Sequence, residues 1–284
     1  MGAAIGEGKI GLLVRLGLYV LLVLLGLPLF SAVAYAAGDI LVGAALGTLA
    51  AAALANALSL RIWERGRLAD IGLDWNAASR RNFVVGALGG AGAAILALGV
   101  PLLVGAAVLR PDPDYPASWA SLLFVSVVLL LGAAGEELLF RGYGFQILLA
   151  RLGPFATILP VSVLFGLAHT ANQCATPLAL ANTTAWGVIL GVAFLRSGDL
   201  WLPIGLHFGW NWLLPLLGAT LSGFTIRTGG YAMEWRASSL WSGGAYGPEG
   251  GLATSLVLFA LALYLWKAPI HGQTPYLARG RKER

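Results

Sequence analysis

Long apolar runs separated by short polar segments fill most of the chain. A run of about 18 or more apolar residues predicts a transmembrane helix, because about 20 helical residues cross the hydrocarbon core of a bilayer. Neither a sequence repeat nor a separate soluble domain is visible. We therefore expect an all-α, polytopic transmembrane helical bundle that forms a single integral membrane domain over 1–284. Its eight expected spans are 12–36, 40–60, 83–108, 119–148, 155–171, 178–195, 201–217 and 252–267.

The composition supports this prediction. Hydrophobic residues make up 58% of the chain and charged residues only 11%, against about 25% charged residues in soluble domains. Most of the 39 glycines lie inside apolar runs, where small residues let helices approach closely in lipid. The net charge of +5 does not predict nucleic-acid binding, because basic residues of a membrane protein mark its cytoplasmic flanks. The single cysteine, Cys174, excludes an intramolecular disulfide and a multi-cysteine metal site.

The positions of Lys and Arg predict the orientation of the bundle. With the N-terminus in the cytoplasm, only Arg110, Arg227 and Arg236 fall in outer segments, and Arg141 is counted as intramembrane. The excess of basic residues on the inner side favours both termini in the cytoplasm. We expect a multi-pass protein of a prokaryotic inner membrane. A signal peptide cleaved near 34–36 stays an alternative, and it would leave the other spans in the same orientation. The cytoplasmic residues are Lys9, Arg15, Arg61, Arg65, Arg67, Arg80, Arg81, Arg151, Arg196, Lys267, Arg279, Arg281, Lys282 and Arg284.

Charged side chains interrupt the fourth expected span, where 135–142 is GEELLFRG. A charge near the centre of a membrane helix costs about 2.5–3.5 kcal/mol, so such residues are rare unless they have a partner or a function. Glu137 and Arg141 are four residues apart and can pair on one helix face, whereas Glu136 lies about 100° around the helix from Glu137. The spacing predicts one neutralised carboxylate and one that is available for chemistry.

Two further spans carry polar groups that lipid cannot satisfy and that must face the bundle interior. The sequence FGLAH ends in His169, and HFGWN begins with His207 and ends with Asn211. Glu136 lies 18 residues before Pro154 and His169 lies 15 residues after it. In an antiparallel hairpin their heights then differ by about 4–5 Å, so we expect them to meet.

Each of these groups alone has a structural interpretation. Glu137 and Arg141 could form a buried ion pair, and a single His or Asn could be a hydrogen-bond partner between helices. The combination of two imidazoles, an amide and a spare carboxylate on three spans favours a functional site. Cys174 lies near an expected loop and is a weak candidate nucleophile, because a catalytic cysteine needs a base of its own.

The three motifs resemble those of the CAAX protease and bacteriocin-processing enzyme family, whose eukaryotic members trim prenylated CAAX proteins. The family pattern consists of a Glu-Glu-x-x-x-Arg helix, a Phe-x-x-x-His helix and a His-x-x-x-Asn/Asp helix. This chain carries EELLFR at 136–141, FGLAH at 165–169 and HFGWN at 207–211, in the same order. The resemblance covers 119–217, the expected catalytic helical core, and implies an intramembrane endopeptidase. Its implied site residues are Glu136, Glu137, Arg141, His169, His207 and Asn211.

The resemblance also implies a role for each group. Glu136 would act as the general base on water, with His169 assisting, and His207 and Asn211 would stabilise the oxyanion. The Glu–Arg pair of the first motif would support the site. A desolvated carboxylate is a stronger base toward water near neutral pH, and donors aimed at a developing oxyanion supply about 3–4 kcal/mol.

No cofactor is expected, but a zinc mechanism is the near alternative. Two His and one Glu can hold zinc with an open position for water, so Glu136, His169 and His207 are the candidate ligands. The sequence HExxH is absent and the two His lie on different spans, which favours catalysis without a metal.

Two other functions stay open. Intramembrane Glu and His are typical of proton relays in transporters, although the chain lacks an inverted repeat and confines its polar groups to three spans. A non-proteolytic membrane scaffold or self-immunity protein could retain the same motifs. The expected partners are the lipid bilayer and a peptide or protein substrate, whose lipidated C-terminus is implied only by the resemblance.

The connection 218–251 is rich in Gly and aromatic residues, including Tyr231, Trp235, Trp241 and Tyr246. One interpretation is an interfacial loop whose rings lie at the level of the lipid headgroups. The other is a lid over the site.

The expected orientation can be tested with topology reporters. Fusions at residue 75 and at the C-terminus should both report the cytoplasm, and a fusion at residue 113 should report the other side. A cytoplasmic signal at residue 113 would contradict the eight-span arrangement.

Overall fold

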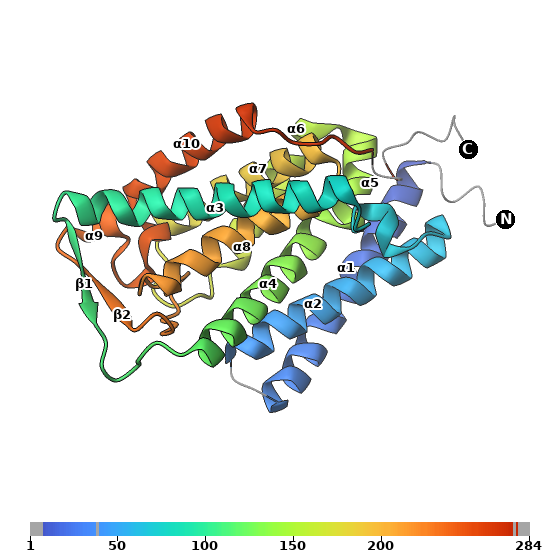
Figure 1. Cartoon of the computed structure of the whole chain (residues 1–284). Coiled ribbons are helices and arrows are strands. Elements are labelled where there is room, and N and C mark those ends of the chain that lie inside the picture. Colours follow the sequence, from blue (N-terminus) through green and yellow to red (C-terminus); the bar gives the residue numbers. More distant parts are fainter. Residues whose placement is uncertain (1–7, 38–39, 275–276, 278–284) are drawn as a thin grey trace.

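The computed structural model describes residues 8–37, 40–274 and 277, and the fold is mostly helical (Figure 1). Helix α3 lies beside α8, α6 lies beside α7, and α1, α2 and α4 form a further group of neighbours. Four basic residues used for the expected orientation, Arg279, Arg281, Lys282 and Arg284, lie outside the described residues. The helices that correspond to expected spans are α1 (Lys9–Ala37), α2 (Ile40–Ser59), α3 (Ala77–Leu103), α4 (Trp119–Arg141), α5 (Tyr143–Leu152), α6 (Pro154–Ala168), α7 (Pro177–Ser197), α8 (Trp201–Leu216) and α10 (Leu252–Lys267).

Not all of these helices are long enough to cross a bilayer. Helices α6, α8 and α10 lie where the sequence predicts them, but they contain 15, 16 and 16 residues. Such helices are about 22–24 Å long, and the hydrocarbon core is about 30 Å thick. The expected count of eight spans and the orientation therefore stay predictions. The five stretches of the described chain that are long and apolar enough are Lys9–Ala36, Ile40–Glu64, Ala77–Leu103, Trp119–Leu152 and Pro177–Ser197.

The fourth expected span, 119–148, is two helices, because α4 and α5 are separated by a break at Gly142. Asn56 of α2 closes this break. Its Nδ2 donates to the carbonyl oxygen of Leu138 at 3.0 Å, and its Oδ1 accepts from the amide of Tyr143 at 2.6 Å. A Cβ atom on Gly142 would overlap the Asn56 side chain. The first motif thus occupies the last turns of α4, and the chain changes direction directly after it.

Glycines bring the backbones of α3 and α8 into contact. A Cβ atom on Gly90 of α3 would overlap the carbonyl oxygen of Leu206, and one on Gly209 of α8 would overlap the carbonyl oxygen of Ala87. Small residues allow such close approach between membrane helices, where dispersion contacts replace the hydrophobic driving force. The packing fixes the position of α8, which carries the third motif.

A small antiparallel sheet joins two of the polar connections. Strand β1 (Ala107–Pro111) pairs with β2 (Tyr231–Trp235), so the expected span 83–108 runs into a strand. The all-α prediction describes the helices correctly and misses this sheet. Strand β2 belongs to residues 218–251, hereafter the 218–251 segment, which also contains the short helix α9 (Ser239–Ser242).

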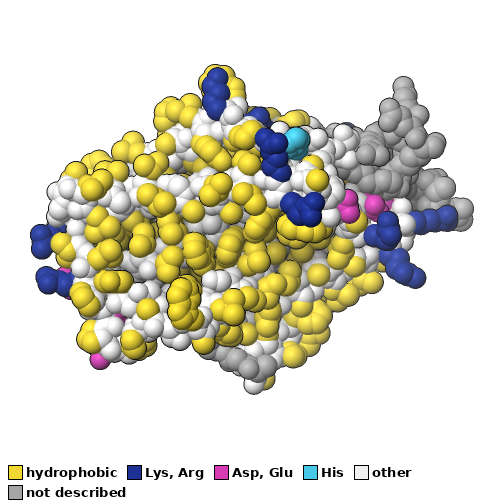
Figure 2. All heavy atoms as spheres, viewed as in Figure 1, with side chains coloured by type: hydrophobic (Ala, Val, Ile, Leu, Met, Phe, Trp, Pro, Cys, Tyr) yellow, Lys and Arg dark blue, Asp and Glu magenta, His cyan; other side chains and the backbone are white. Residues whose placement is uncertain are grey.

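The outer surface of the bundle is hydrophobic. Figure 2 shows apolar side chains over most of the visible face, with Lys and Arg side chains at both ends of the molecule and in the upper part of the view. Large apolar side chains are exposed on α1, α3, α4, α6 and α10. A contiguous apolar surface of this extent is a liability in water, and it suits a protein surrounded by lipid.

The contact between α3 and α8 gives a matched pair of variants. Gly90→Ala should destabilise the protein by about 1–3 kcal/mol, because the added methyl group forces two backbones apart. Gly92→Ala on the same helix should be neutral or slightly stabilising, since nothing lies within 4 Å of a Cβ atom there. Thermal unfolding in detergent measures the difference, and equal melting temperatures would contradict the close packing.

Candidate active site

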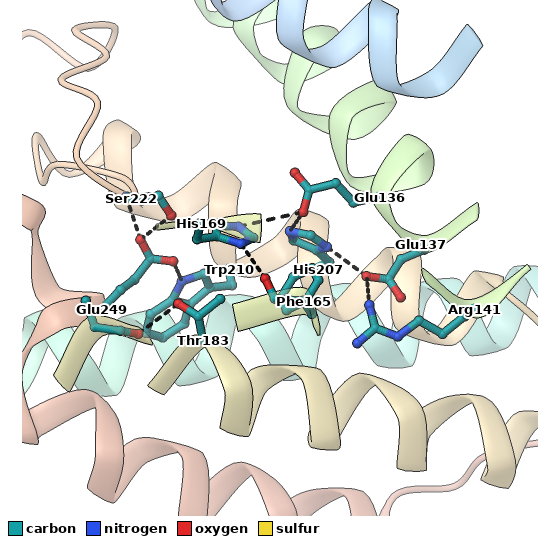
Figure 3. A network of polar contacts seen from close by, with 11 residues as sticks. Glu136, Glu137, Arg141, Phe165, His169, Thr183, His207, Trp210, Ser222 and Glu249 are labelled. Carbon is teal, nitrogen blue, oxygen red and sulfur yellow. Dashed lines mark hydrogen bonds and ion pairs between the residues drawn. The ribbon is translucent and has the colours of Figure 1, made fainter. Parts of the chain in front are cut away.

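Glu136 on α4, His207 on α8 and His169 at the end of α6 meet inside the bundle (Figure 3). The Nε2 atom of His169 lies 4.0 Å from Oε2 of Glu136, and the Nε2 atom of His207 lies 3.9 Å from the same oxygen. Glu136 is on α4, His207 is on α8, and His169 directly follows the last residue of α6. The structure thus confirms that Glu136 and His169 meet, and it brings the third motif to the same point.

The second carboxylate of the first motif is buried and paired. Oε1 of Glu137 lies 3.2 Å from Nη1 of Arg141, and the two side chains are 0% and 1% exposed. Nη2 of Arg141 also donates to the carbonyl oxygen of Gly187 on α7 at 2.9 Å, and its guanidinium lies over the Phe165 ring, 4.8 Å from the ring centre. The ion pair predicted from the four-residue spacing is confirmed, and it also ties α4 to α7.

Glu137 has a second partner that the sequence did not predict. Its Oε1 atom lies 2.9 Å from Nδ1 of His207. An ionised carboxylate only accepts hydrogen bonds, so Nδ1 of His207 carries the proton. The other ring nitrogen, Nε2, therefore points at Glu136 as an acceptor when the ring is neutral and as a donor when it is charged.

His169 is held in the same tautomer by the backbone. Its Nδ1 atom lies 2.8 Å from the carbonyl oxygen of Phe165, and a carbonyl oxygen can only accept, so Nδ1 donates. Phe165 is buried and its ring packs against both His169 and His207. Phe165 and His169 of the second motif therefore act as one unit, in which the first residue orients the second.

These groups lie on the wall of a cavity of about 380 Å³. Glu136, His169, His207 and Asn211 all line it, so the six expected site residues divide into four at the cavity and a buried Glu–Arg pair behind them. The rest of the wall is mainly apolar and includes Ala44, Ala45 and Thr48 of α2, together with residues of the 218–251 segment. The roles expected for the four cavity residues stay predictions.

Glu249, in the 218–251 segment, is a cavity residue that sequence reasoning missed. It is 8% exposed, and its carboxylate accepts from Nε1 of Trp210 at 3.0 Å and from both the amide and the hydroxyl of Ser222, at 2.6 and 2.8 Å (Figure 3). Burial, and after it the charge of Glu249, raises the pKa of Tyr246 above its ordinary value. The signal in the sequence is a single carboxylate in the otherwise uncharged stretch 237–266.

The candidate zinc ligands do not form a ready metal site. Within residues 8–37, 40–274 and 277, no group of three or more His, Cys, Asp or Glu side chains is arranged to hold a metal ion. Glu136, His169 and His207 do not form such a group at the separations given above.

Comparison with known proteins recognises the part of the chain that carries the motifs. Residues 118–213 match the model of the family described as type II CAAX prenyl endopeptidase Rce1-like. The chain is also 32% identical over 154 residues to an uncharacterized 24.3 kDa protein of Escherichia coli, an alignment that covers 50% of this chain and 62% of that relative. No solved structure matches the chain.

The match confirms, over 118–213, the resemblance drawn from the three motifs. The matched residues include all three motifs. The helices that are able to span a membrane agree with an integral membrane protein.

The buried pair predicts a strong effect of Arg141→Ala. Removing the guanidinium leaves Glu137 charged in an enclosed site, at a cost of about 3–5 kcal/mol. We expect a lower membrane yield and a lower melting temperature. Arg110→Ala is the matched control, because its ion pair with Glu234 is 60% and 57% exposed and is worth about 1 kcal/mol or less. Normal stability of Arg141→Ala would contradict a buried ion pair.

Proposed function

We propose that the chain is an intramembrane endopeptidase of the CAAX-protease type, in which Glu136 activates water to hydrolyse a peptide bond near the membrane. One observation carries the proposal. Oε2 of Glu136 is enclosed by protein without a hydrogen-bond donor among the described residues, and two His Nε2 atoms face it at 3.9 and 4.0 Å. A buried carboxylate oxygen needs a donor. A water molecule between Oε2 and an Nε2 atom would supply one, in the place that a general base requires.

The adjacent carboxylates of Glu136 and Glu137 are proposed to have different roles. Oε1 of Glu137 already accepts from Arg141 and His207, so taking a proton would break a buried network. Oε2 of Glu136 has no hydrogen-bond donor among the described residues, and the Glu136 side chain is 32% exposed and lines the cavity. The carboxylate that meets the cavity is therefore the one proposed as the base.

The proposed reaction needs no co-reactant other than water. Glu136 takes a proton from water while the water oxygen bonds to the carbonyl carbon of the substrate. The electron pair of the carbonyl bond moves to its oxygen and gives an oxyanion. Collapse of this intermediate breaks the C–N bond, and the proton held by Glu136 passes to the leaving amine. The carboxylate is restored for the next turnover.

The oxyanion is proposed to be stabilised from α8. Because Nδ1 of His207 is committed to Glu137, its Nε2 atom can donate only when the ring is an imidazolium. In that form Nδ1 still donates to Glu137 while Nε2 donates to the oxyanion. Asn211, one turn further along α8, lines the same cavity and offers an amide donor from the same side. Preorganised donors of this kind contribute about 3–4 kcal/mol in hydrolytic enzymes.

His169 is proposed to hold the water. Its Nδ1–H is used by the Phe165 carbonyl oxygen, which leaves Nε2 of the neutral ring as an acceptor. A water molecule that donates to Nε2 of His169 and to Oε2 of Glu136 has its lone pairs free for attack. This arrangement gives His169 a positioning role next to the base.

The substrate and the cellular setting belong to the same proposal. The family implies a peptide or protein substrate, and the apolar walls of the cavity would accommodate a chain with a lipidated C-terminus. We retain the orientation with both termini in the cytoplasm and a location in a prokaryotic inner membrane, because the basic residues gather on one side of the predicted spans.

Zinc held by Glu136, His169 and His207 is the alternative mechanism. The donor set fits zinc chemistry, and each His donates its Nδ1–H to an oxygen acceptor, as zinc-binding His usually do. The separations of 3.9 and 4.0 Å exceed the roughly 3.3 Å between ligands of a tetrahedral zinc, so the site would have to contract. For this reason we favour catalysis without a metal. A proton-coupled transporter and a non-proteolytic scaffold remain the competing functions.

A peptidase assay on the purified protein tests the proposal. Wild type should cleave a membrane-associated peptide, and Glu136→Gln should lower turnover by at least about a hundredfold, in line with loss of a general base. Treatment with a strong chelator should spare the activity, and Asn211→Ala should lower turnover more than it changes substrate binding.

Metal analysis beside that assay separates the mechanisms. Stoichiometric zinc that disappears in His207→Ala, together with activity lost to chelation and restored by zinc, would establish the zinc mechanism instead. A folded wild type that cleaves no peptide, or a Glu136→Gln variant with full activity, would refute the proposed function.

A further inference from the structure

The cavity extends beyond the part of the chain that the family model recognises. The match ends at residue 213, but Leu221, Ser222, Phe224, Ile226 and Glu249 also line the cavity. All five come from the 218–251 segment. One wall of the space in front of Glu136 is therefore built by residues outside the recognised motif region.

Glu249 holds this wall against α8. Its carboxylate accepts from the backbone and side chain of Ser222 and from Nε1 of Trp210. Ser222 lies near the start of the 218–251 segment and Glu249 near its end, so the carboxylate closes the segment into a loop. Trp210 is 2% exposed and lies in the third motif, directly before Asn211. The same three hydrogen bonds thus fix the loop and its position relative to the motif.

A second set of contacts holds the other side of Glu249. Nδ2 of Asn182, on α7, donates to the carbonyl oxygens of Glu249 at 2.8 Å and of Gly251 at 3.0 Å. Oγ1 of Thr254 donates to the carbonyl oxygen of Pro248 at 2.7 Å. The turn that carries Glu249 is therefore anchored to α7 and α10 by its backbone, which leaves its carboxylate free to hold Ser222 and Trp210.

We propose that the 218–251 segment is the specificity-determining wall of the site and that Glu249 is the positioning residue that holds it in place. The wall receives an apolar side chain of the substrate, because Leu221, Phe224 and Ile226 present apolar groups to the cavity. The identity of the occupant rests on the proposed function. Glu249 itself is not a catalytic residue, since its oxygens are occupied by three donors of the chain.

Kinetics on a peptide series tests the wall. The peptides differ only in one apolar side chain next to the cleaved bond, which is Ala, Leu or Phe. Phe224→Ala and Ile226→Ala enlarge the space, so each should raise kcat/KM for the bulkiest peptide relative to the smallest by about tenfold, the usual scale for a change of pocket size. Leu240→Ala is the matched control. It lies in the same segment, is 55% exposed and does not line the cavity, so the preference should not change.

Thiol labelling tests the hydrogen bonds of Glu249 without relying on catalysis. Thr183 lines the cavity and is 7% exposed. In full-length protein carrying Cys174→Ser and Thr183→Cys, a small maleimide should react slowly. Adding Glu249→Gln should raise the labelling rate about tenfold, because the wall opens more often when charge-assisted hydrogen bonds are lost. Glu234→Gln, in the same segment but exposed and away from the cavity, should leave the rate unchanged.

The two readouts separate this inference from the proposed function. Altered peptide preference in Phe224→Ala or Ile226→Ala, with faster labelling in Glu249→Gln, supports the wall. Unchanged preference in both variants overturns it, and an unchanged labelling rate overturns the role of Glu249. If wild type cleaves no peptide, the proposed function fails, and the labelling rate alone decides whether the wall is held by Glu249.

Discussion

The buried carboxylate of Glu137 is the interaction on which the geometry of the site depends. It lies on α4, and its Oε1 atom accepts from Arg141 and from His207, while Arg141 also reaches the backbone of α7 at Gly187. A buried charge is tolerated only when its partners are in place. Any movement of α4, α7 or α8 that separates these groups therefore carries a large free-energy cost. Glu136, the residue directly before Glu137, lines the cavity, and the same contacts between helices hold it in place.

The apolar pattern predicts most of the fold, because the length of a membrane helix leaves a clear mark in a sequence. The pairing of Glu137 with Arg141 follows from the spacing of four residues within one helix. The bond between Glu137 and His207 does not, since it joins residues 70 positions apart through the packing of α4 with α8. The break at Gly142 is equally hidden, because it is closed by Asn56, which lies 87 positions before Tyr143. The ion pair within one helix could therefore be predicted from the sequence. The contacts between helices, which orient that pair and end α4, could not.

The position of the cavity also depends on where the neighbouring helices end. Helix α6 ends directly before His169, and irregular backbone follows at 170–176. Such backbone is tolerated at membrane depth only where protein or enclosed water satisfies it. The 218–251 segment lies against this stretch, since Gly223 is in close contact with the backbone of Gln173. The cavity therefore lies between the end of α6 and the 218–251 segment, which packs against the residues that follow α6.

The contact between Asn56 and the α4–α5 break shows that the candidate site depends on residues outside the three motifs. The three motifs lie within 118–213, but the helix that presents Glu136 ends where it does because a side chain of α2 binds both sides of Gly142. Tyr19 of α1 adds a hydroxyl that donates to the carbonyl oxygen of Leu139 at 2.8 Å. The smallest part of the chain that could form this site therefore includes α1 and α2 as well as the motifs. A graft of 118–213 into another bundle would carry every motif residue and would lack Asn56 and Tyr19, which bind the end of α4.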